Sequence, residues 1–196
     1  HMVENSKVVL ENDMIENWRS VYKEADMLSE ELSELLQAER ADINEFLSDD
    51  NMQQSYLRNV FSKLVEVLQY NETSGIFLIL ANSESADEEA AYHGFFVRDS
   101  DPQTKTALNT DLLLERGSKA LSHSISIPLD SSWSTDFHLM GNGVRSCDDF
   151  FYRPYLAGLE YSDSRMSDLG YWSRPFILEN HYMDNHKMIT YSLPLA

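Results

Sequence analysis

The sequence contains a single cysteine, Cys147, among 196 residues. One thiol excludes an internal disulfide and any zinc site built from several cysteines. Long hydrophobic runs are also missing: the longest, Ile76 to Ala81, is far shorter than the about 20 residues that a transmembrane helix needs. As it stands, the sequence is expected to fold in water.

Basic residues are scarce. Fifteen Lys and Arg face 33 Asp and Glu, which gives a formal net charge of -18. Such a charge repels phosphate backbones and anionic lipid surfaces. We therefore expect no binding to nucleic acid and no docking on an anionic membrane surface, and we expect the acidity to keep an exported surface soluble.

Catalytic motifs are absent as well. The sequence has no Gly-x-Ser-x-Gly, no phosphate-binding glycine loop and no His-Glu-x-x-His. The adjacent acids Asp49-Asp50 and Asp148-Asp149 are expected to cap helices, because neighbours in sequence do not face each other across a substrate. Ser122-His123 has no identifiable acid to orient the histidine. The fragment is thus not expected to be an enzyme or to hold a cofactor.

One run has the residue types of a metal site. His181, Asp184 and His186 offer two imidazoles and a carboxylate. They lie in what resembles a hairpin tip without further spaced ligands, so we expect solvated loop residues and no metal.

Hydrophobic residues make up 42% of the chain and aromatic residues 11%, enough for a well-packed core. His1 and Met2 resemble a cloning remnant. We expect residues 3–73 to form a helical stalk that belongs to the same domain, and residues 74–196 to form a sheet-based core.

Residues 4–47 are expected to form one long helix. Apolar residues recur there every three or four positions, at Trp18, Val21, Ala25, Leu28, Leu32 and Leu35. A helix of some forty residues reaches roughly 60 Å, longer than a small domain is wide. The narrow stripe predicts either a homodimer through this helix or ordinary packing on the core.

A second helix is expected after the capping residues Ser48 to Asn51, with a buried face formed by Leu57, Phe61, Leu64 and Leu68 and an end at Asn71 to Gly75. Residues 75–81 and 92–98 then predict an antiparallel pair of strands around an acidic loop, 82–90.

The rest of the chain alternates short elements. We expect a loop at 99–109, a helical stretch at 111–124 broken at Gly117, a strand at 136–140, a helix at 150–161 and a strand at 188–194. The order of elements predicts an α+β fold with an antiparallel sheet.

Three local runs resemble Cache (also called PDC) extracytoplasmic sensor domains of bacterial kinases, diguanylate cyclases and chemoreceptors. They are residues 111–117 with Ile127-Pro-Leu-Asp and Trp133, residues 150–158 (Phe-Phe-Tyr-Arg-Pro-Tyr-Leu-Ala-Gly), and residues 171–176 with 189–194. The resemblance spans nearly the whole chain. It implies a long N-terminal helix packed on a PAS-like antiparallel sheet, and a membrane-tethered receptor whose output domain lies elsewhere.

The same resemblance implies a small-molecule site. It places Arg153 at a cavity, where a guanidinium can hold a carboxylate, with an aromatic wall of Phe151, Tyr152, Tyr155 and Trp172, and with Trp133 and Phe137 as further members. Structural ion pairing of Arg153 and plain core packing of the rings are the alternatives.

Two departures from the family pattern stand out. The Arg-Pro-Tyr element lacks the intervening tryptophan of the family, so the amino-acid-binding form of the pocket is not carried over. The chain also ends at Ala196, where the family usually adds a final strand.

Two other functions remain open. One is a protein-interaction module that uses the acidic long helix and has no pocket. The other is a hydrolase with paired catalytic groups in one cleft.

Overall fold

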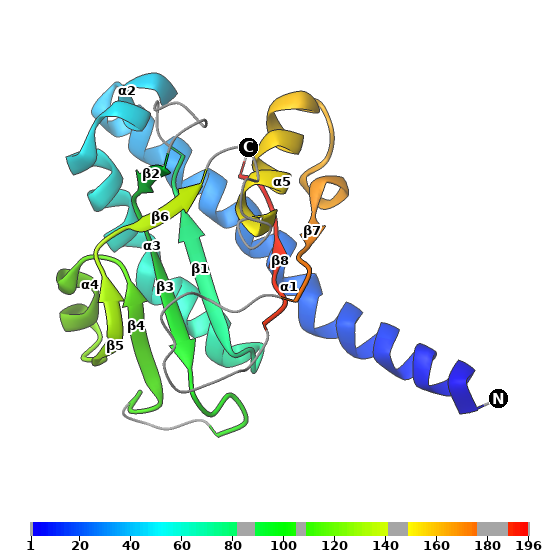
Figure 1. Ribbon diagram of the computed structural model, residues 1–196. Coiled ribbons are helices and arrows are strands. Elements are labelled where there is room, and N and C mark those ends of the chain that lie inside the picture. Colours follow the sequence, from blue (N-terminus) through cyan, green and yellow to red (C-terminus); the bar gives the residue numbers. More distant parts are fainter. Residues whose placement is uncertain (1, 82–88, 105–108, 141–148, 176–187, 196) are drawn as a thin grey trace.

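The computed structural model describes residues 2–81, 89–104, 109–140, 149–175 and 188–195. It is an α+β fold in which long helices lie against a mixed sheet (Figure 1). The helices are α1 (Met2–Glu39), α2 (Ile43–Ser48), α3 (Asp50–Tyr70), α4 (Lys119–Ser124), α5 (Asp149–Glu160) and the short 3-10 helix η3 (Met166–Leu169).

The main sheet has four strands in the order β1-β3-β4-β5. They are β1 (Gly75–Ile79), β3 (Gly94–Asp99), β4 (Leu112–Arg116) and β5 (Leu129–Ser134). β1–β3 and β3–β4 are antiparallel, whereas β4 and β5 are parallel. Two separate ribbons pair β2 (Glu89–Tyr92) with β6 (Phe137–Met140), and β7 (Tyr171–Trp172) with β8 (Tyr191–Ser192).

The main core lies between α3 and one face of the sheet. Along β1 and β3 the side chains alternate between the two faces, so Leu78, Phe95 and Val97 join the core cluster. α3 contributes the predicted face of Leu57, Phe61, Leu64 and Leu68, each at most 4% exposed. The ring of Phe61 meets that of Phe95 edge-on at 4.9 Å. α1 closes this layer through Ala25 and Leu28, which are both buried.

The prediction of one helix over 4–47 was wrong at its C-terminal end. α1 stops at Glu39 because Arg40 adopts a left-handed conformation, with φ 56°. Asp42 then caps α2: its side chain accepts from the Asn44 and Glu45 amides, while the Glu45 carboxylate accepts from the Asp42 amide. This reciprocal capping box starts a new helix in a new direction.

The prediction of a helical stretch at 111–124 was wrong in its first half. Residues 112–116 form β4, in which Leu112 and Leu114 are fully buried on the core side. Gly117, with φ 120°, ends the strand, and only residues 119–124 are helical. The parallel pairing of β4 and β5 also makes the sheet mixed, which corrects the expected wholly antiparallel sheet.

Other predictions need adjustment only at their ends. The second helix is confirmed, with Asp49 as its N-cap and Asn71 as its C-cap. The hairpin of β1 and β3 is confirmed, although Tyr92 belongs to β2 and β3 begins at Gly94. The strand at 136–140 and the helix at 150–161 are confirmed as β6 and α5. Of the predicted strand 188–194, only residues 191–192 pair as β8.

α1 extends well past the rest of the molecule (Figure 1). Its C-terminal half lies along α3, while the N-terminal half projects away from the sheet and the other helices. The Tyr56 hydroxyl donates to the Leu28 carbonyl at 2.8 Å, and Lys63 of α3 pairs with Glu31. The fold therefore consists of a body from which a helix protrudes.

Candidate functional site

A second hydrophobic cluster lies on the sheet face opposite α3. We call it the aromatic cluster; its buried members are Tyr92, Phe96, Phe137, Leu139, Phe150, Phe151 and Tyr152. α5 supplies Phe150 to Tyr152, the β2–β6 ribbon supplies Tyr92, Phe137 and Leu139, and the sheet supplies Phe96. The cluster thus joins α5, the ribbon and the sheet.

The rings of the aromatic cluster contact one another closely. Phe151 lies 5.0 Å from the ring centroids of both Tyr92 and Tyr152. The Tyr92 and Tyr152 hydroxyls are 3.2 Å apart, within hydrogen-bonding distance inside the cluster. Rings with polar tips give large contact areas and directed hydrogen bonds together. Such surroundings suit recognition of a small molecule as well as core packing.

The structure brings four of the predicted site residues together. Phe137, Phe151 and Tyr152 are buried in the aromatic cluster, and Tyr155 is half-buried and stacked on Phe151 at 5.6 Å. Arg153, on the same helix, is exposed. The guanidinium therefore does not lie within the cluster.

The two predicted tryptophans lie elsewhere. Trp172 of β7 is half-buried and packs on Tyr191 of β8, with ring centroids 5.0 Å apart. Trp133 of β5 packs on the main core; its indole N–H donates to the Gly117 carbonyl at 3.0 Å, and Lys119 lies over its ring. Trp133 therefore supports the turn between β4 and α4.

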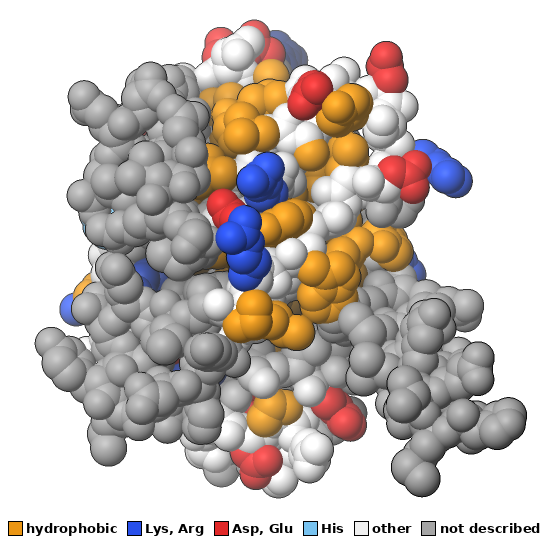
Figure 2. Space-filling model, turned by 45° about the vertical axis from the view of Figure 1, so that its right-hand side comes forward, with side chains coloured by type: hydrophobic (Ala, Val, Ile, Leu, Met, Phe, Trp, Pro, Cys, Tyr) orange, Lys and Arg blue, Asp and Glu red, His pale blue; other side chains and the backbone are white. Residues whose placement is uncertain are grey.

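The side of the molecule that holds α5 carries exposed apolar groups. Leu156, Leu159 and Tyr161, at the end of α5, are between 45% and 65% exposed. Figure 2 shows basic side chains next to hydrophobic ones on this face. The exposed guanidinium of Arg174 lies 4.0 Å from the Asp149 carboxylate at the start of α5. A ligand with both an anionic and an apolar part would find both types of group here.

A buried charge cluster on the sheet was not predicted from the sequence. Arg98 of β3 donates to the Glu115 carboxylate at 2.6 Å and to the Asp130 carboxylate at 3.0 Å. Glu115 is 1% exposed. Burial tends to raise the pKa of Asp130, but hydrogen bonds from Ser132 and Arg98 outweigh it and hold that pKa below its usual range. No short-range pattern in the sequence pairs these three charges, because they lie on three different strands.

His93 forms a second unpredicted link, between elements distant in sequence. It lies between β2 and β3, with Nδ1 2.8 Å from the Asp136 carboxylate and Nε2 3.1 Å from that of Asp50. Since both partners are acceptors, both ring nitrogens must carry a proton for the two bonds to form. Burial alone would lower the pKa of His93, but the bonds and charges of Asp136 and Asp50 outweigh burial and raise it.

This arrangement predicts a pH-dependent contribution to stability. Because the folded-state pKa of His93 lies above the ordinary value, its contribution is complete below about pH 6.5 and is lost as the pH rises through the folded-state value. His93→Asn should lower the free energy of unfolding by about 1 kcal/mol at pH 6 and by clearly less at pH 9. Urea unfolding at both pH values measures this, with His123→Asn, an exposed histidine of α4, as the control. An equal loss at both pH values would contradict the prediction.

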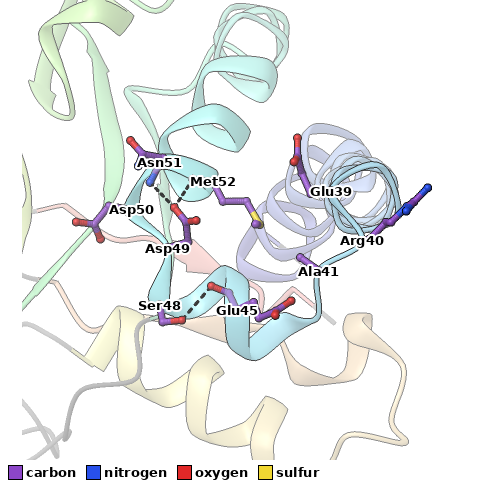
Figure 3. A pocket seen from close by; sticks show the side chains of 9 residues that line it. All are labelled: Glu39, Arg40, Ala41, Glu45, Ser48, Asp49, Asp50, Asn51 and Met52. Carbon is purple, nitrogen blue, oxygen red and sulfur yellow. Dashed lines mark hydrogen bonds between the residues drawn. The ribbon is translucent and has the colours of Figure 1, made fainter.

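An open depression of about 680 Å³ lies where α1, α2 and α3 meet. Figure 3 shows its lining, from Glu39 of α1 to Met52 of α3. Two of its acidic residues cap helices. Asp49 accepts from the Asn51 and Met52 amides, and Glu45 closes the capping box of α2. The depression is explained by helix capping and gives no reason to place a ligand there.

Among the residues that the structure describes, no three His, Cys, Asp or Glu side chains are grouped to hold a metal ion. His181, Asp184 and His186 lie outside the described residues. None of the helices, as far as the structure describes them, has a stretch apolar enough to cross a bilayer.

Comparison of the chain with protein-family models, with curated proteins and with solved structures found no match.

Proposed function

We propose that this chain is the extracytoplasmic sensor domain of a membrane-anchored signalling protein, of the Cache type, and that it detects a small molecule. One observation carries the proposal: a 38-residue helix whose N-terminal half protrudes belongs to an α+β body in which α5 and the β2–β6 ribbon cover an aromatic cluster. In a receptor domain, such a helix would carry a change in the body over a distance.

The ligand would bind at the aromatic cluster, between α5 and the sheet. The rings fill this space in the structure, so binding requires α5 to shift and the Tyr92–Tyr152 contact to open. Arg153, exposed on α5, would then hold an anionic group of the ligand at the edge of the cluster. The ligand shifts the conformation of α5 only by the difference between its affinities for the two arrangements.

A homodimer through α1 belongs to the same proposal, with a narrower interface than the sequence predicted. Ala25 and Leu28 of the apolar stripe are buried in the body of the same chain, and Leu32 and Leu35 pack against that core. Pairing between copies would therefore use the protruding half of α1.

The first test is a thermal-shift screen with amino acids, organic acids, sugars and amines. A ligand present at 100 times its Kd should stabilise the fold by about 2.7 kcal/mol, which raises Tm by about 5–10 °C for a chain of this size. Arg153→Ala should abolish the shift caused by an anionic hit and leave the Tm of the free protein within about 2 °C, since the side chain is exposed.

Arg165→Ala is the matched control, because Arg165 is an exposed arginine that pairs with Asp168, three residues away. It should keep the full ligand-induced shift. A shift that persists in Arg153→Ala would exclude the proposed role of Arg153, and a screen without any hit would count against the sensor function.

The exposed acids of α1 favour one rival, a protein-interaction module without a pocket. Glu30 and Glu34 are exposed on this helix, so a basic partner could dock there. The rival predicts a flat ligand screen together with a partner whose binding is lost in the Glu30→Lys/Glu34→Lys variant of the whole chain.

A further inference from the structure

The last described segment, residues 188–195, contacts the aromatic cluster, the main core, β7 and α5. Met188 packs against the aromatic cluster, and Leu195 packs against the main core. Between them, β8 pairs with β7, and Pro194 lies against Gly158 of α5. We call residues 188–195 the C-terminal strap.

Tyr191 connects the strap to α1. Its hydroxyl lies 2.6 Å from that of Tyr22, and the two rings meet edge-on with centroids 6.2 Å apart. Trp172 packs on the same ring at 5.0 Å. Burial, followed by the bond with Tyr22, raises the pKa of Tyr191 well above its ordinary value.

Two glycines make this close approach possible. A Cβ atom at Gly170 would lie 2.0 Å from the Tyr191 hydroxyl oxygen, and one at Gly158 would lie 3.0 Å from Pro194 Cβ. Any side chain at Gly170 would displace the Tyr191 ring. The strap is thus fitted to both neighbours and does not merely lie on the surface.

Tyr22 lies near the N-terminal end of the part of α1 that packs on the body. Ala25 and Leu28, one and two turns further on, are buried against the body, and the Leu28 carbonyl accepts from Tyr56 of α3. The N-terminal half of α1 projects away from the body (Figure 1), and Tyr22 lies just past the midpoint of this helix. The Tyr22–Tyr191 contact therefore lies where the anchored part of α1 gives way to the protruding part.

We propose that the C-terminal strap is the latch that couples α5 and the aromatic cluster to the protruding half of α1. The inference deepens the proposed sensor function and rests on it. A movement of α5 would displace the strap, and the strap would then break or keep its contact with Tyr22 of α1. The contacts of the strap with α5 and α1 exist without a ligand, so the coupling can be tested on the free protein.

Hydrogen–deuterium exchange on the free protein tests the latch. Gly170→Ala should push the Tyr191 hydroxyl away from Tyr22 without removing either group. Loss of one hydrogen bond of about 1 kcal/mol raises local exchange about fivefold, and we expect that increase both in the strap and in residues 20–27 of α1. Exchange in α3 and β3 should stay unchanged.

Tyr22→Phe is the second variant, because it removes the same bond and keeps the ring shape. Its effect on residues 20–27 should match that of Tyr191→Phe, and the double variant should add little to either, since both delete one contact. Tyr161→Phe, an exposed tyrosine at the end of α5, is the matched control and should change nothing in α1.

A strap that loosens while α1 keeps its protection would overturn the latch. So would a uniform increase across α3 and β3, which would show general destabilisation. Because no ligand is used, these outcomes are independent of those of the ligand screen. If the exchange data support the latch but the screen finds no ligand, the sensor function is refuted, while the coupling between the strap and α1 still holds.

Discussion

Replacing Arg98 with alanine is expected to lower the free energy of unfolding by about 3 kcal/mol at pH 7. Arg98 is the cation between the Glu115 and Asp130 carboxylates, and Glu115 has almost no access to water. Without the guanidinium, each carboxylate would lose a charge-assisted hydrogen bond in a poorly solvated place, although the charge of Arg116 also acts on both. Breaking a buried pair by removing one partner costs more than the pair contributes, and the partial exposure of Arg98 places the effect at the lower end of the usual range.

The dependence of this loss on pH provides an internal check. Ionised Asp130 stabilises the fold at pH values above its ordinary pKa. This contribution is lost as the pH falls through the lower pKa that Asp130 has in the folded state. The difference between the wild type and Arg98→Ala should therefore be complete at pH 7 and shrink below about pH 4. Urea unfolding at the two pH values measures it.

Matched substitutions separate the charge from the geometry. Arg98→Lys keeps the charge but cannot bridge both carboxylates, so it should recover only part of the loss. Arg58→Ala, an exposed arginine of α3, should change stability by no more than about 0.5 kcal/mol. A loss below about 1 kcal/mol in Arg98→Ala would show that the cluster acts as an ordinary surface ion pair.

Gly94→Ala is expected to destabilise the fold by about 3 kcal/mol. Gly94 opens β3 opposite Ile79, and a Cβ atom there would lie 2.2 Å from the Leu78 carbonyl oxygen and 3.1 Å from the Ile79 Cα. These are backbone atoms of β1, which cannot turn aside as a side chain can. The strands would have to separate at the point where the sheet and the β2–β6 ribbon diverge.

Gly75→Ala at the other end of the same strand pair is the control. Its Cβ atom would lie 2.7 Å from a ring carbon of Phe96 and 3.2 Å from the Val97 carbonyl oxygen, so the severe overlap is with a side chain, which shifts more easily than a strand backbone. The loss should therefore be smaller, about 1 kcal/mol. Chemical unfolding of both variants compares them, and a loss at Gly75 equal to or above that at Gly94 would contradict the backbone-clash explanation.

Local patterns predicted the elements that are periodic and end at recognisable caps. α3 is the clearest case, because Asp49 precedes a strict apolar stripe that ends at Leu68. The end of α1 was missed although Asp42 and Glu45 have the spacing of a capping box, since the apolar residues Ile43 and Phe46 prolong the stripe. β4 was missed because three consecutive leucines fit a strand and a helix equally well.

The residues of the candidate site also fall into a predicted group and an unpredicted group. Phe151, Tyr152 and Phe137 are aromatic residues on predicted elements, and they meet because α5 and β6 both cover the sheet. The links of His93 with Asp50 and Asp136, and of Tyr22 with Tyr191, join residues at least 43 positions apart. No short-range pattern records such pairs; they depend on the paths of the strands and of the strap.

The most direct test of the sensor account is hydrogen–deuterium exchange during titration with a compound from the ligand screen. The account predicts that protection rises in α5, residues 149–160, and that exchange in residues 20–27 of α1 changes with the same midpoint concentration. Protection confined to some other surface, with α5 and α1 unaffected at saturation, would contradict it.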